Sequence, residues 1–364
     1  MSLNEKKVVV GMSGGVDSSV AAYLLKRDGY DVVGVMLKLW AEEGGTRDNA
    51  CCSLASVNDA RQVAAAIGIS FYLLDAASSF YENVVVPFIE AYLRGETPNP
   101  CAACNPLVRW RWLLNYADLI GAEYVATGHY ARIRRNSAGV PILSRGADRR
   151  KDQSYILSRI PIDALKRSLF PLGELTKPEV RQIAKEAGLP SSEKKESQDI
   201  CFIAGGDYRA FLRRRAGGRF YPGTFIDPDG KVLGEHDGLP FYTIGQRKGI
   251  RIASPEPKYV LRKNAQDQTI TVGSRADALV ERIRLRDVNW LRSGADPAEE
   301  KIFAQLRYQS APVGVRLERQ PDGSVLVRFS APQPAIAPGQ TCTLYDDSDQ
   351  VIASGTINLI NLST

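Results

Sequence analysis

The chain has 364 residues, a formal net charge of +6 and 44% hydrophobic residues. This length predicts two or three domains, and a charged fraction of 24% excludes a largely disordered chain. No apolar run approaches the roughly 20 residues of a membrane span, and the first residues form no apolar signal segment, so we expect a cytoplasmic protein with no membrane partner.

Short apolar runs alternate with helix-period segments over the first 130 residues. We expect strands at residues 8–10, 32–37, 71–74 and 124–127, and helices at residues 18–27, 54–67, 84–93 and in a stretch that ends near residue 120. This alternation predicts an α/β, Rossmann-like fold, in which helices cover both faces of a parallel sheet and ligands bind beyond the carboxyl ends of the strands.

A glycine-rich loop joins the first expected strand to the first expected helix. It comprises Gly11, Met12, Ser13, Gly14, Gly15, Val16, Asp17 and Ser18. The amides of such a loop and the positive end of the following helix converge on one point, where they bind phosphate. The loop lacks the Gly-Lys-Ser/Thr ending of a nucleotide-hydrolysing P-loop. Its Ser-Gly-Gly-x-Asp-Ser pattern resembles the signature of the PP-loop ATP pyrophosphatases, which adenylate a substrate oxygen.

Two further segments are expected to meet this loop. Leu37 follows the second expected strand, and Gly128-His129 follows the strand at residues 124–127. Because the carboxyl ends of parallel strands share one edge of a sheet, all three should line one cleft. We expect this cleft to hold ATP with Mg²⁺.

Residues 97–105 read Thr-Pro-Asn-Pro-Cys-Ala-Ala-Cys-Asn and are expected to form a loop before a helix that begins at Pro106. A thiolate just before a helix N-terminus is stabilised by the helix dipole, so we expect a lowered pKa and a nucleophilic role for Cys104. Cys201 follows a polar stretch that can fold over the cleft. Cys342 is expected inside a barrel, and Cys51 and Cys52 are expected to be structural.

The Cys101-x-x-Cys104 pair also allows two metal sites. A closed zinc site takes four ligands, usually from two such pairs, and the sequence has no second pair. The thiolates of Cys101, Cys104 and Cys201 would instead suit three irons of a [4Fe-4S] cluster, with one iron left open for sulfide. We interpret His129 as a residue of the nucleotide cleft and His236 as a turn residue.

After an expected helix at residues 178–187, the pattern changes near residue 208. The turn segments 227–230 and 264–267 separate short alternating runs, which predicts hairpins. Six short strands at residues 283–291, 302–308, 313–317, 325–329, 341–345 and 351–360 predict a small closed barrel. We therefore expect a PP-loop domain at residues 1–207, a small mostly-β central domain at residues 208–275 and a C-terminal β-barrel at residues 276–364.

Lys and Arg residues cluster at positions 132–151, 213–219 and 247–251. Clusters of this kind favour a polyanionic partner such as nucleic acid.

Seven motifs then stand in order along nearly the whole chain. They are Ser-Gly-Gly-Val-Asp-Ser, Thr-Pro-Asn-Pro with Cys104-Asn105, Ala126-Thr-Gly-His-Tyr, Lys151-Asp-Gln-Ser-Tyr, Ser197-Gln-Asp-Ile-Cys-Phe, Tyr242-Thr-Ile-Gly-Gln-Arg-Lys-Gly and Arg307-Tyr308. Together they resemble the tRNA-specific 2-thiouridylase (MnmA) family.

This resemblance implies a role for each matched residue. Gly11 to Ser18, Leu37 and Gly128 would bind ATP, Cys104 would attack, and Cys201 would carry a persulfide. Contacts with tRNA would come from Asn99, Pro100, Cys101, Lys151, Asp152, Gln153, Arg307 and Tyr308. The partners would be a tRNA with U34 in its anticodon loop and a sulfur-donor protein, either a cysteine desulfurase or a relay protein. Many family members have Asp where this chain has Cys101, so a general-base role for that aspartate does not carry over.

The implied chemistry agrees with the residues. Replacing the C2 oxygen of uracil by sulfur needs a leaving group on that oxygen, which adenylation by ATP supplies. It also needs a soft nucleophile, which a persulfide supplies, and a neighbouring thiolate can release the sulfur by forming a disulfide. The uridine must leave its stack to reach a buried cleft. Two alternatives remain, a PP-loop ligase or amidotransferase that adenylates a small metabolite and a passive RNA-binding module.

Overall fold

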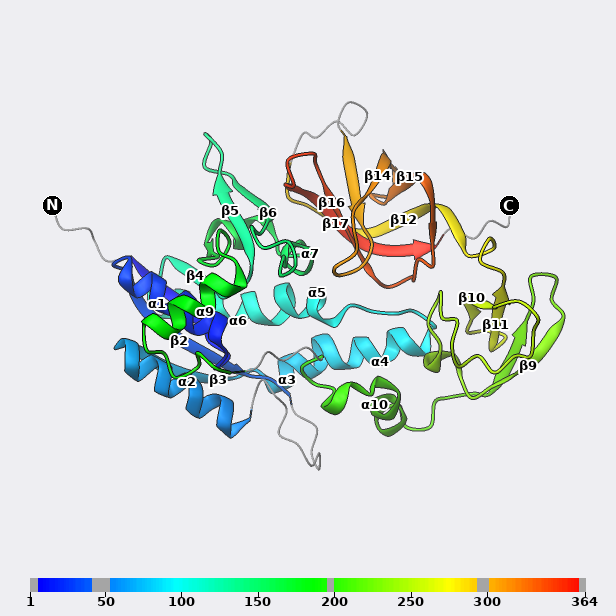
Figure 1. Cartoon of the computed structure of the whole chain (residues 1–364), viewed down its shortest axis with the longest axis horizontal. Helices are drawn as coiled ribbons and strands as arrows, with labels where there is room; N and C mark the ends of the chain where they lie inside the picture. The colour runs from blue at the N-terminus through cyan, green and yellow to red at the C-terminus, as the bar shows by residue number, and fades with distance from the viewer. Residues whose placement is uncertain (1–5, 41–52, 195–199, 293–300, 360–364) are drawn as a thin grey trace.

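The structure is a computed structural model that describes residues 6–40, 53–194, 200–292 and 301–359. Figure 1 shows an α/β part in blue to green, a smaller β part in yellow-green and a barrel in orange to red, in chain order. This arrangement confirms the predicted fold class.

A five-stranded parallel sheet forms the centre of the N-terminal part, in the order β3-β2-β1-β4-β7. Its strands are β1 (Lys7–Gly11), β2 (Asp31–Lys38), β3 (Ser70–Asp75), β4 (Tyr124–Thr127) and β7 (Ser168–Leu169). Alternate residues of a strand point to opposite faces of a sheet. Val8 and Val10 accordingly pack in a cluster with residues of α1 and α2, whereas Val9 packs with Trp110 and Leu113 on the other face.

Helices of this part cover both faces of the sheet, with α1 and α2 on one face and η2 and α6 on the other, and further helices pack beside them. The helices of this part are α1 (Val16–Arg27), α2 (Leu54–Ile67), α3 (Ala77–Phe80), the π-helical η1 (Tyr81–Val85), α4 (Val86–Leu93), α5 (Pro100–Cys104), the π-helical η2 (Asn105–Trp110), α6 (Arg111–Leu119), α7 (Ser154–Leu157), α8 (Ile162–Lys166) and α9 (Lys177–Glu186). The helix predicted at residues 54–67 is confirmed with the same limits.

Residues 100–119 form one uninterrupted helical run, made of α5, η2 and α6. Asn99 caps its start, since the Asn99 side-chain oxygen accepts a hydrogen bond of 3.2 Å from the backbone amide of Ala102, and Pro100 occupies the first turn. The backbone is still helical at Asn105 and Arg111, where the segments meet. The prediction of a loop over residues 97–105 was therefore wrong from Pro100 onward.

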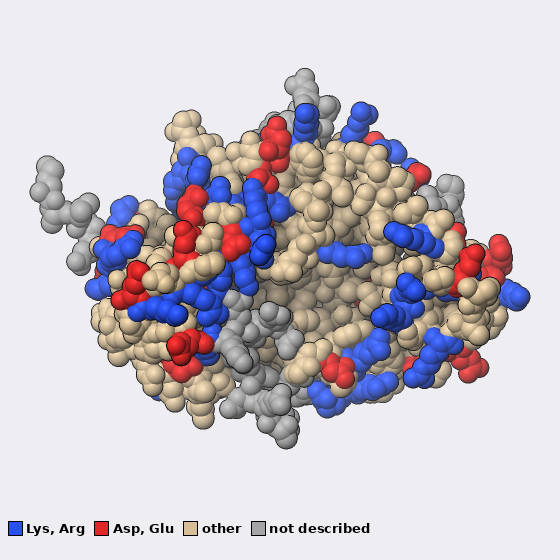
Figure 2. Space-filling model, in the orientation of Figure 1, with Lys and Arg blue, Asp and Glu red and all other residues tan. Residues whose placement is uncertain are grey.

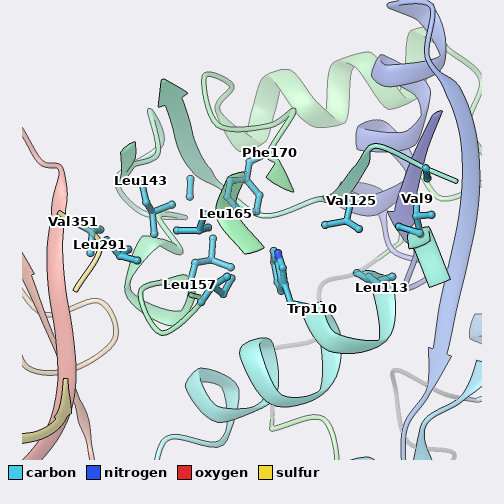
Figure 3. Close-up of a cluster of buried hydrophobic side chains, with 14 of the residues drawn as sticks. Val9, Trp110, Leu113, Val125, Leu143, Leu157, Leu165, Phe170, Leu291 and Val351 are labelled. Carbon is cyan, nitrogen blue, oxygen red and sulfur yellow. The ribbon is translucent and has the colours of Figure 1, made fainter. Parts of the chain in front are cut away.

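A hairpin that the sequence did not predict links the sheet to the barrel. Its strands are β5 (Ala131–Arg135) and β6 (Pro141–Arg145), and Ser144 forms an isolated bridge with Gln350. Figure 3 shows one cluster of buried side chains running from the sheet to the barrel, with Val9, Val125, Trp110, Leu113, Leu143, Leu157, Leu291 and Val351 among its members. The N-terminal part and the barrel thus share a hydrophobic core.

The central part has a four-stranded sheet in the order β10-β11-β8-β9. Its elements are the 3₁₀ segment η3 (Ala204–Gly206), α10 (Tyr208–Arg215), β8 (Gly223–Ile226), β9 (Val232–His236), the 3₁₀ segment η4 (Leu239–Phe241), β10 (Tyr259–Asn264) and β11 (Thr269–Gly273). Both predicted hairpins are present. Helix α10 was missed, and it buries Phe211 and Leu212 in a cluster with Phe88 of α4. The interpretation of His236 as a turn residue was wrong, because it is the buried last residue of β9.

Six antiparallel strands close into the predicted barrel, in the order β12-β15-β14-β13-β16-β17. They are β12 (Leu279–Trp290), β13 (Ile302–Gln305), β14 (Val313–Arg319), β15 (Val325–Pro334), β16 (Thr341–Tyr345) and β17 (Val351–Leu359). Cys342 lies in β16, is fully buried and belongs to the barrel core, as expected. Strand β13 ends at Gln305, so Arg307 and Tyr308 lie in the turn after it rather than in the predicted strand. No helix in the described part of the chain is long and apolar enough to cross a membrane.

Candidate active site

The glycine-rich loop leaves β1 and enters α1 at Val16, and Gly15 precedes the helix in an extended conformation. Within the described residues, no side chain caps this helix, so its first amides point at the loop without a side-chain acceptor. Gly14 has φ +71°, and a Cβ there would lie 2.5 Å from the carbonyl oxygen of Ser56, so only glycine fits. The loop is therefore held open at the positive end of α1, where an anion is favoured.

One cleft opens beyond the carboxyl ends of β1, β2 and β4, where the sequence predicted it. Its lining residues are Gly11, Met12, Ser13, Asp17, Ser18, Val35, Met36, Leu37, Leu39, Arg109, Leu113, Thr127, Gly128, His129 and Gln153. Leu37 belongs to β2 itself rather than to the segment after it. The structure thus brings the loop, Leu37 and Gly128 together, while Gly14, Gly15 and Val16 support the loop from outside the lining.

Gly128 packs directly on the start of α1. A Cβ at Gly128 would lie 2.6 Å from the carbonyl carbon of Asp17 and 2.7 Å from the amide nitrogen of Ser18. This contact explains why the chain needs a glycine at the end of β4.

Lys177 is a site residue that sequence reasoning missed. It stands at the first position of α9, and its Nζ donates a hydrogen bond of 2.6 Å to Oδ1 of Asp17. The Tyr130 hydroxyl donates to the same oxygen at 2.7 Å. Asp17 is the one acidic residue among the described residues that line the cleft, and Lys177 brings a largely buried positive charge beside it.

His129 lies buried in the cleft wall, with ring contacts to Trp110 and Phe170. Its Nδ1 and the hydroxyl of Thr127 are 2.8 Å apart. Burial, with a smaller effect of the Arg109 charge, lowers the pKa of His129 to about 3. The imidazole is therefore neutral near pH 7, and the interpretation of His129 as a cleft residue agrees with its position.

Two of the candidate thiols, Cys104 and Cys201, belong to one hydrophobic cluster. Cys104 is buried in it beside α3 and α4, and the half-buried Cys201 packs against the same cluster. Cys104 lies inside the helical run of residues 100–119, so the expected effect of a helix N-terminus on this thiol has no basis. The exposed Cys101 occupies the first turn instead. Cys51 and Cys52, and the first three residues of the Ser197 motif, lie outside the described residues.

Metal binding by the three thiols does not fit this arrangement. No group of three or more His, Cys, Asp or Glu side chains in the described segments is placed to hold a metal ion.

The residues expected to contact tRNA fall in two environments. Cys101 and Tyr308 are exposed, and Lys151 and Asn99 are half-buried. Asp152 is buried, accepts hydrogen bonds from the amides of Gly146 and Ser154 at 3.0 and 3.1 Å, and has its pKa raised by burial. Pro100 is also buried. An internal supporting role suits Asp152 and Pro100 better than a direct contact with a large ligand.

Several basic residues of the predicted surface patch form ion pairs with acidic residues of the same chain. Arg132 and Arg134 pair with Glu174, and Arg149 pairs with Asp349 at 2.5 Å. On the face in Figure 2, Lys and Arg side chains nevertheless lie on both sides of a hollowed, mostly uncharged area. Such a distribution favours a polyanion that spans the hollow.

A parallel sheet with a glycine loop at its first strand, followed by two small β domains, defines a nucleotide-binding α/β protein with two appended β domains. Residues 6–205 match the family described as tRNA methyl transferase HUP domain, residues 209–274 its PRC-barrel domain and residues 280–357 the aminomethyltransferase beta-barrel domain. A protein of Carboxydothermus hydrogenoformans named tRNA-specific 2-thiouridylase MnmA is 44% identical over 98% of both chains. One of the same name from Heliobacterium modesticaldum is 45% identical over 97% of this chain and 92% of its own. The chain belongs to the tRNA-specific 2-thiouridylase MnmA family, which confirms the resemblance.

Similarity to solved structures is weak by comparison. A 4-thiouridine synthetase in complex with RNA and ATP is 18% identical and aligns over 57% of this chain and 50% of its own, with a TM-score of 0.35. That similarity is too low to bear on function.

Proposed function

We propose that this protein is a tRNA-uridine 2-sulfurtransferase that uses ATP to replace the C2 oxygen of the wobble uridine U34 by sulfur. The observation that carries the proposal is the joint presence of two features in a member of the 2-thiouridylase family. One is an anion-binding loop in an open cleft, and the other is a pair of cysteines on one buried cluster. A small-metabolite ligase would need only the first of these features.

ATP is the proposed substrate of the cleft. The amides of residues 11–18 and the start of α1 would bind its phosphates, with Leu37 and Gly128 forming the adjoining walls. Lys177 adds a positive charge beside the loop, which suits the charge that develops on pyrophosphate as it leaves. Asp17 would hold Mg²⁺, which supplies further neutralisation of phosphate charge when bound.

Cys104 and Cys201 are the proposed sulfur-transfer pair. A donor protein would leave a persulfide on Cys201, and its terminal sulfur would attack C2 of the adenylated uridine while AMP departs with the oxygen. The Cys104 thiolate would then attack the Cys201 sulfur, so that a disulfide forms and the terminal sulfur stays on the base. A reductant restores both thiols. The shared cluster of Cys104 and Cys201 supports this pairing.

The remaining assignments are proposals of the same kind. Lys151, Gln153, Arg307, Tyr308, Asn99 and Cys101 would face the tRNA, while Asp152 and Pro100 would support them. We retain domain limits of 1–207, 208–275 and 276–364, which the ranges of the three matched families support. A cysteine desulfurase or relay protein as sulfur donor and a cytoplasmic location stay predictions.

The decisive experiment incubates the protein with ATP, a cysteine desulfurase with cysteine as the persulfide donor, a thiol reductant and an unmodified tRNA that carries U34, and follows AMP and the nucleosides by mass spectrometry. We expect AMP only when tRNA is present, and 2-thiouridine at position 34. AMP release that depends on a small metabolite rather than on tRNA would overturn the proposal. A U34C tRNA is the matched control and should give neither product.

A further inference from the structure

Arg145 is a buried cation at the interface between the N-terminal part and the barrel. It ends β6, and its side chain is 10% exposed. Its guanidinium lies over the Tyr345 ring, with Cζ 4.0 Å from the ring centroid. Burying an arginine is costly unless each part of it is paired, and an apolar residue would stabilise such a site as well. The charge therefore needs an explanation beyond stability.

On the barrel side, Arg145 reaches the turn after β13 through one residue. Arg145 Nη2 donates to the side-chain oxygen of Gln305 at 2.7 Å, and Gln305 is itself buried. The Gln305 amide nitrogen donates in turn to the carbonyl oxygen of Arg307 at 3.1 Å. Arg145 thus fixes the backbone of the turn that carries Arg307 and Tyr308.

On the other side, Arg145 reaches the nucleotide cleft. Its Nη1 lies 3.6 Å from Oδ2 of Asp152, whose carboxylate accepts a hydrogen bond of 3.1 Å from the amide of Ser154, the residue directly after Gln153. Gln153 lines the cleft and accepts a hydrogen bond of 2.9 Å from the amide of Tyr130, the residue whose hydroxyl binds Asp17. A planar guanidinium can hold Gln305 and Asp152 in a fixed relation at once, which a lysine ammonium cannot.

We propose that Arg145 is a positioning residue that sets the Arg307–Tyr308 turn relative to the nucleotide cleft, so that tRNA bound to the turn presents its uridine at the cleft. The inference rests on the proposed function, because it assigns the turn to tRNA. Asp349 adds two contacts, as its backbone oxygen accepts a hydrogen bond from the Arg145 amide at 3.1 Å and its carboxylate forms an ion pair with Nε at 3.3 Å, although Nε makes no hydrogen bond among the described residues.

Two substitutions test the proposal. Arg145→Lys keeps the positive charge beside Asp152 but lacks the planar guanidinium whose second nitrogen reaches Gln305. Gln305→Met keeps the volume of the side chain and removes its hydrogen bond from Arg145 as well as its hydrogen bond to the turn. Each should raise KM for tRNA about tenfold, the size of one hydrogen bond to a charged group. Turnover at saturating tRNA and the affinity for a non-hydrolysable ATP analogue should stay within about twofold of wild type, because the cleft is intact.

The double variant should raise KM no further than either single variant, since both break the same connection. Arg159→Lys is the matched control. Arg159 also crosses this interface, where Nη1 donates to the carbonyl oxygen of Asp287 at 2.6 Å, but its hydrogen bonds among the described residues go to β12 and β17 and not to the turn. Its KM for tRNA should not change.

An unchanged KM in both single variants would overturn the proposal. Equal effects in Arg159→Lys would instead indicate a general loosening of the interface, and equal losses of ATP and tRNA affinity would indicate a purely structural arginine; either result also overturns it. Failure of the proposed function is distinguishable, because wild-type protein would then make no 2-thiouridine, while tRNA affinity measured by filter binding would still test the role of Arg145.

Discussion

The ammonium nitrogen of Lys177 lies 2.6 Å from Oδ1 of Asp17 and joins α9 to the glycine loop across 160 residues of sequence. This pair places a positive and a negative side chain where the phosphates of ATP are expected. Tyr130 donates to the same oxygen, so two side chains orient Asp17.

Lys177→Met should reduce tRNA-dependent AMP formation about 10²–10³-fold, because it removes a charge aimed at the leaving pyrophosphate. Lys185→Met is the control, since Lys185 is an exposed residue of the same helix. Initial rates of AMP release at saturating tRNA measure both. If Lys177→Met forms AMP at nearly the rate of the control, Lys177 has no role in AMP formation.

Gly128→Ala should weaken ATP binding at least about tenfold, equal to about 1.4 kcal/mol, because its Cβ would displace the start of α1. Gly234→Ala in β9 is the control, as a Cβ there would meet no described atom within 4 Å. Equilibrium dialysis with labelled ATP gives both affinities. Normal ATP affinity in Gly128→Ala would contradict the proposal that ATP binds in this cleft.

Cys104→Ser and Cys201→Ser should each leave tRNA unthiolated while ATP still binds, because sulfur transfer needs both thiols. Cys342→Ala should remain active and lose roughly 1–2 kcal/mol of stability, the effect of a small cavity in the barrel core. Nucleoside mass spectrometry and urea unfolding measure the two effects. Full thiolation by Cys201→Ser would refute the mechanism.

Cys101→Ala separates the persulfide mechanism from the iron-sulfur alternative. With a persulfide on Cys201, the variant should keep substantial activity, since Cys101 is exposed at the start of α5 and outside the buried cluster. Iron and sulfide analysis of anaerobically prepared protein provides the second measurement. Joint loss of iron and turnover in this variant would favour the cluster instead.

Acidification should destabilise the wild-type protein more than His129→Gln. The folded pKa of His129 is lowered to about 3, whereas the unfolded value is about 6.5, so the unfolded chain takes up a proton first as the pH falls. The contribution of the neutral imidazole is complete above pH 6.5 and is lost toward pH 3. Between pH 6.5 and 5 this difference amounts to about 2 kcal/mol. Urea unfolding at several pH values measures it, and parallel curves for the two proteins would exclude a buried neutral His129.

Arg150→Ala together with Lys151→Ala should flatten the salt dependence of tRNA binding. Each lost phosphate contact lowers the log-log slope by about 0.7–0.9. Arg149→Ala should change the slope less, because Arg149 is already paired with Asp349. Binding curves at four or more salt concentrations test this, and an unchanged slope in the double variant would exclude the segment as a phosphate contact.

Local patterns were enough to predict much of the architecture. Helix α2 and the six barrel strands have periodicities that depend on neighbouring residues alone. The cleft could also be predicted, because the carboxyl ends of parallel strands meet at one edge whatever the details of packing.

The predictions were wrong or incomplete where two local sequence signals favour different helix starts, or where contacts with residues distant in sequence stabilise an element. Pro100 and Pro106 are equally good first residues of a helix, and only the cap by Asn99 distinguishes them. Helix α10 has few residues and a polar composition, and its stability comes from burying Phe211 in a cluster of the N-terminal part. Nothing near Arg145 in sequence indicates that Gln305 and Tyr345 would bury it.

The helical run of residues 100–119 has a mechanical consequence. It carries Cys104 near one end and Leu113, a wall of the cleft, further along. Nine helical steps separate these two residues, which corresponds to roughly 13 Å at the rise of an α-helix and to somewhat less because η2 is π-helical. No hinge interrupts this spacer within the described residues. One continuous helical backbone therefore sets the separation between the thiol of Cys104 and the wall of the cleft at Leu113.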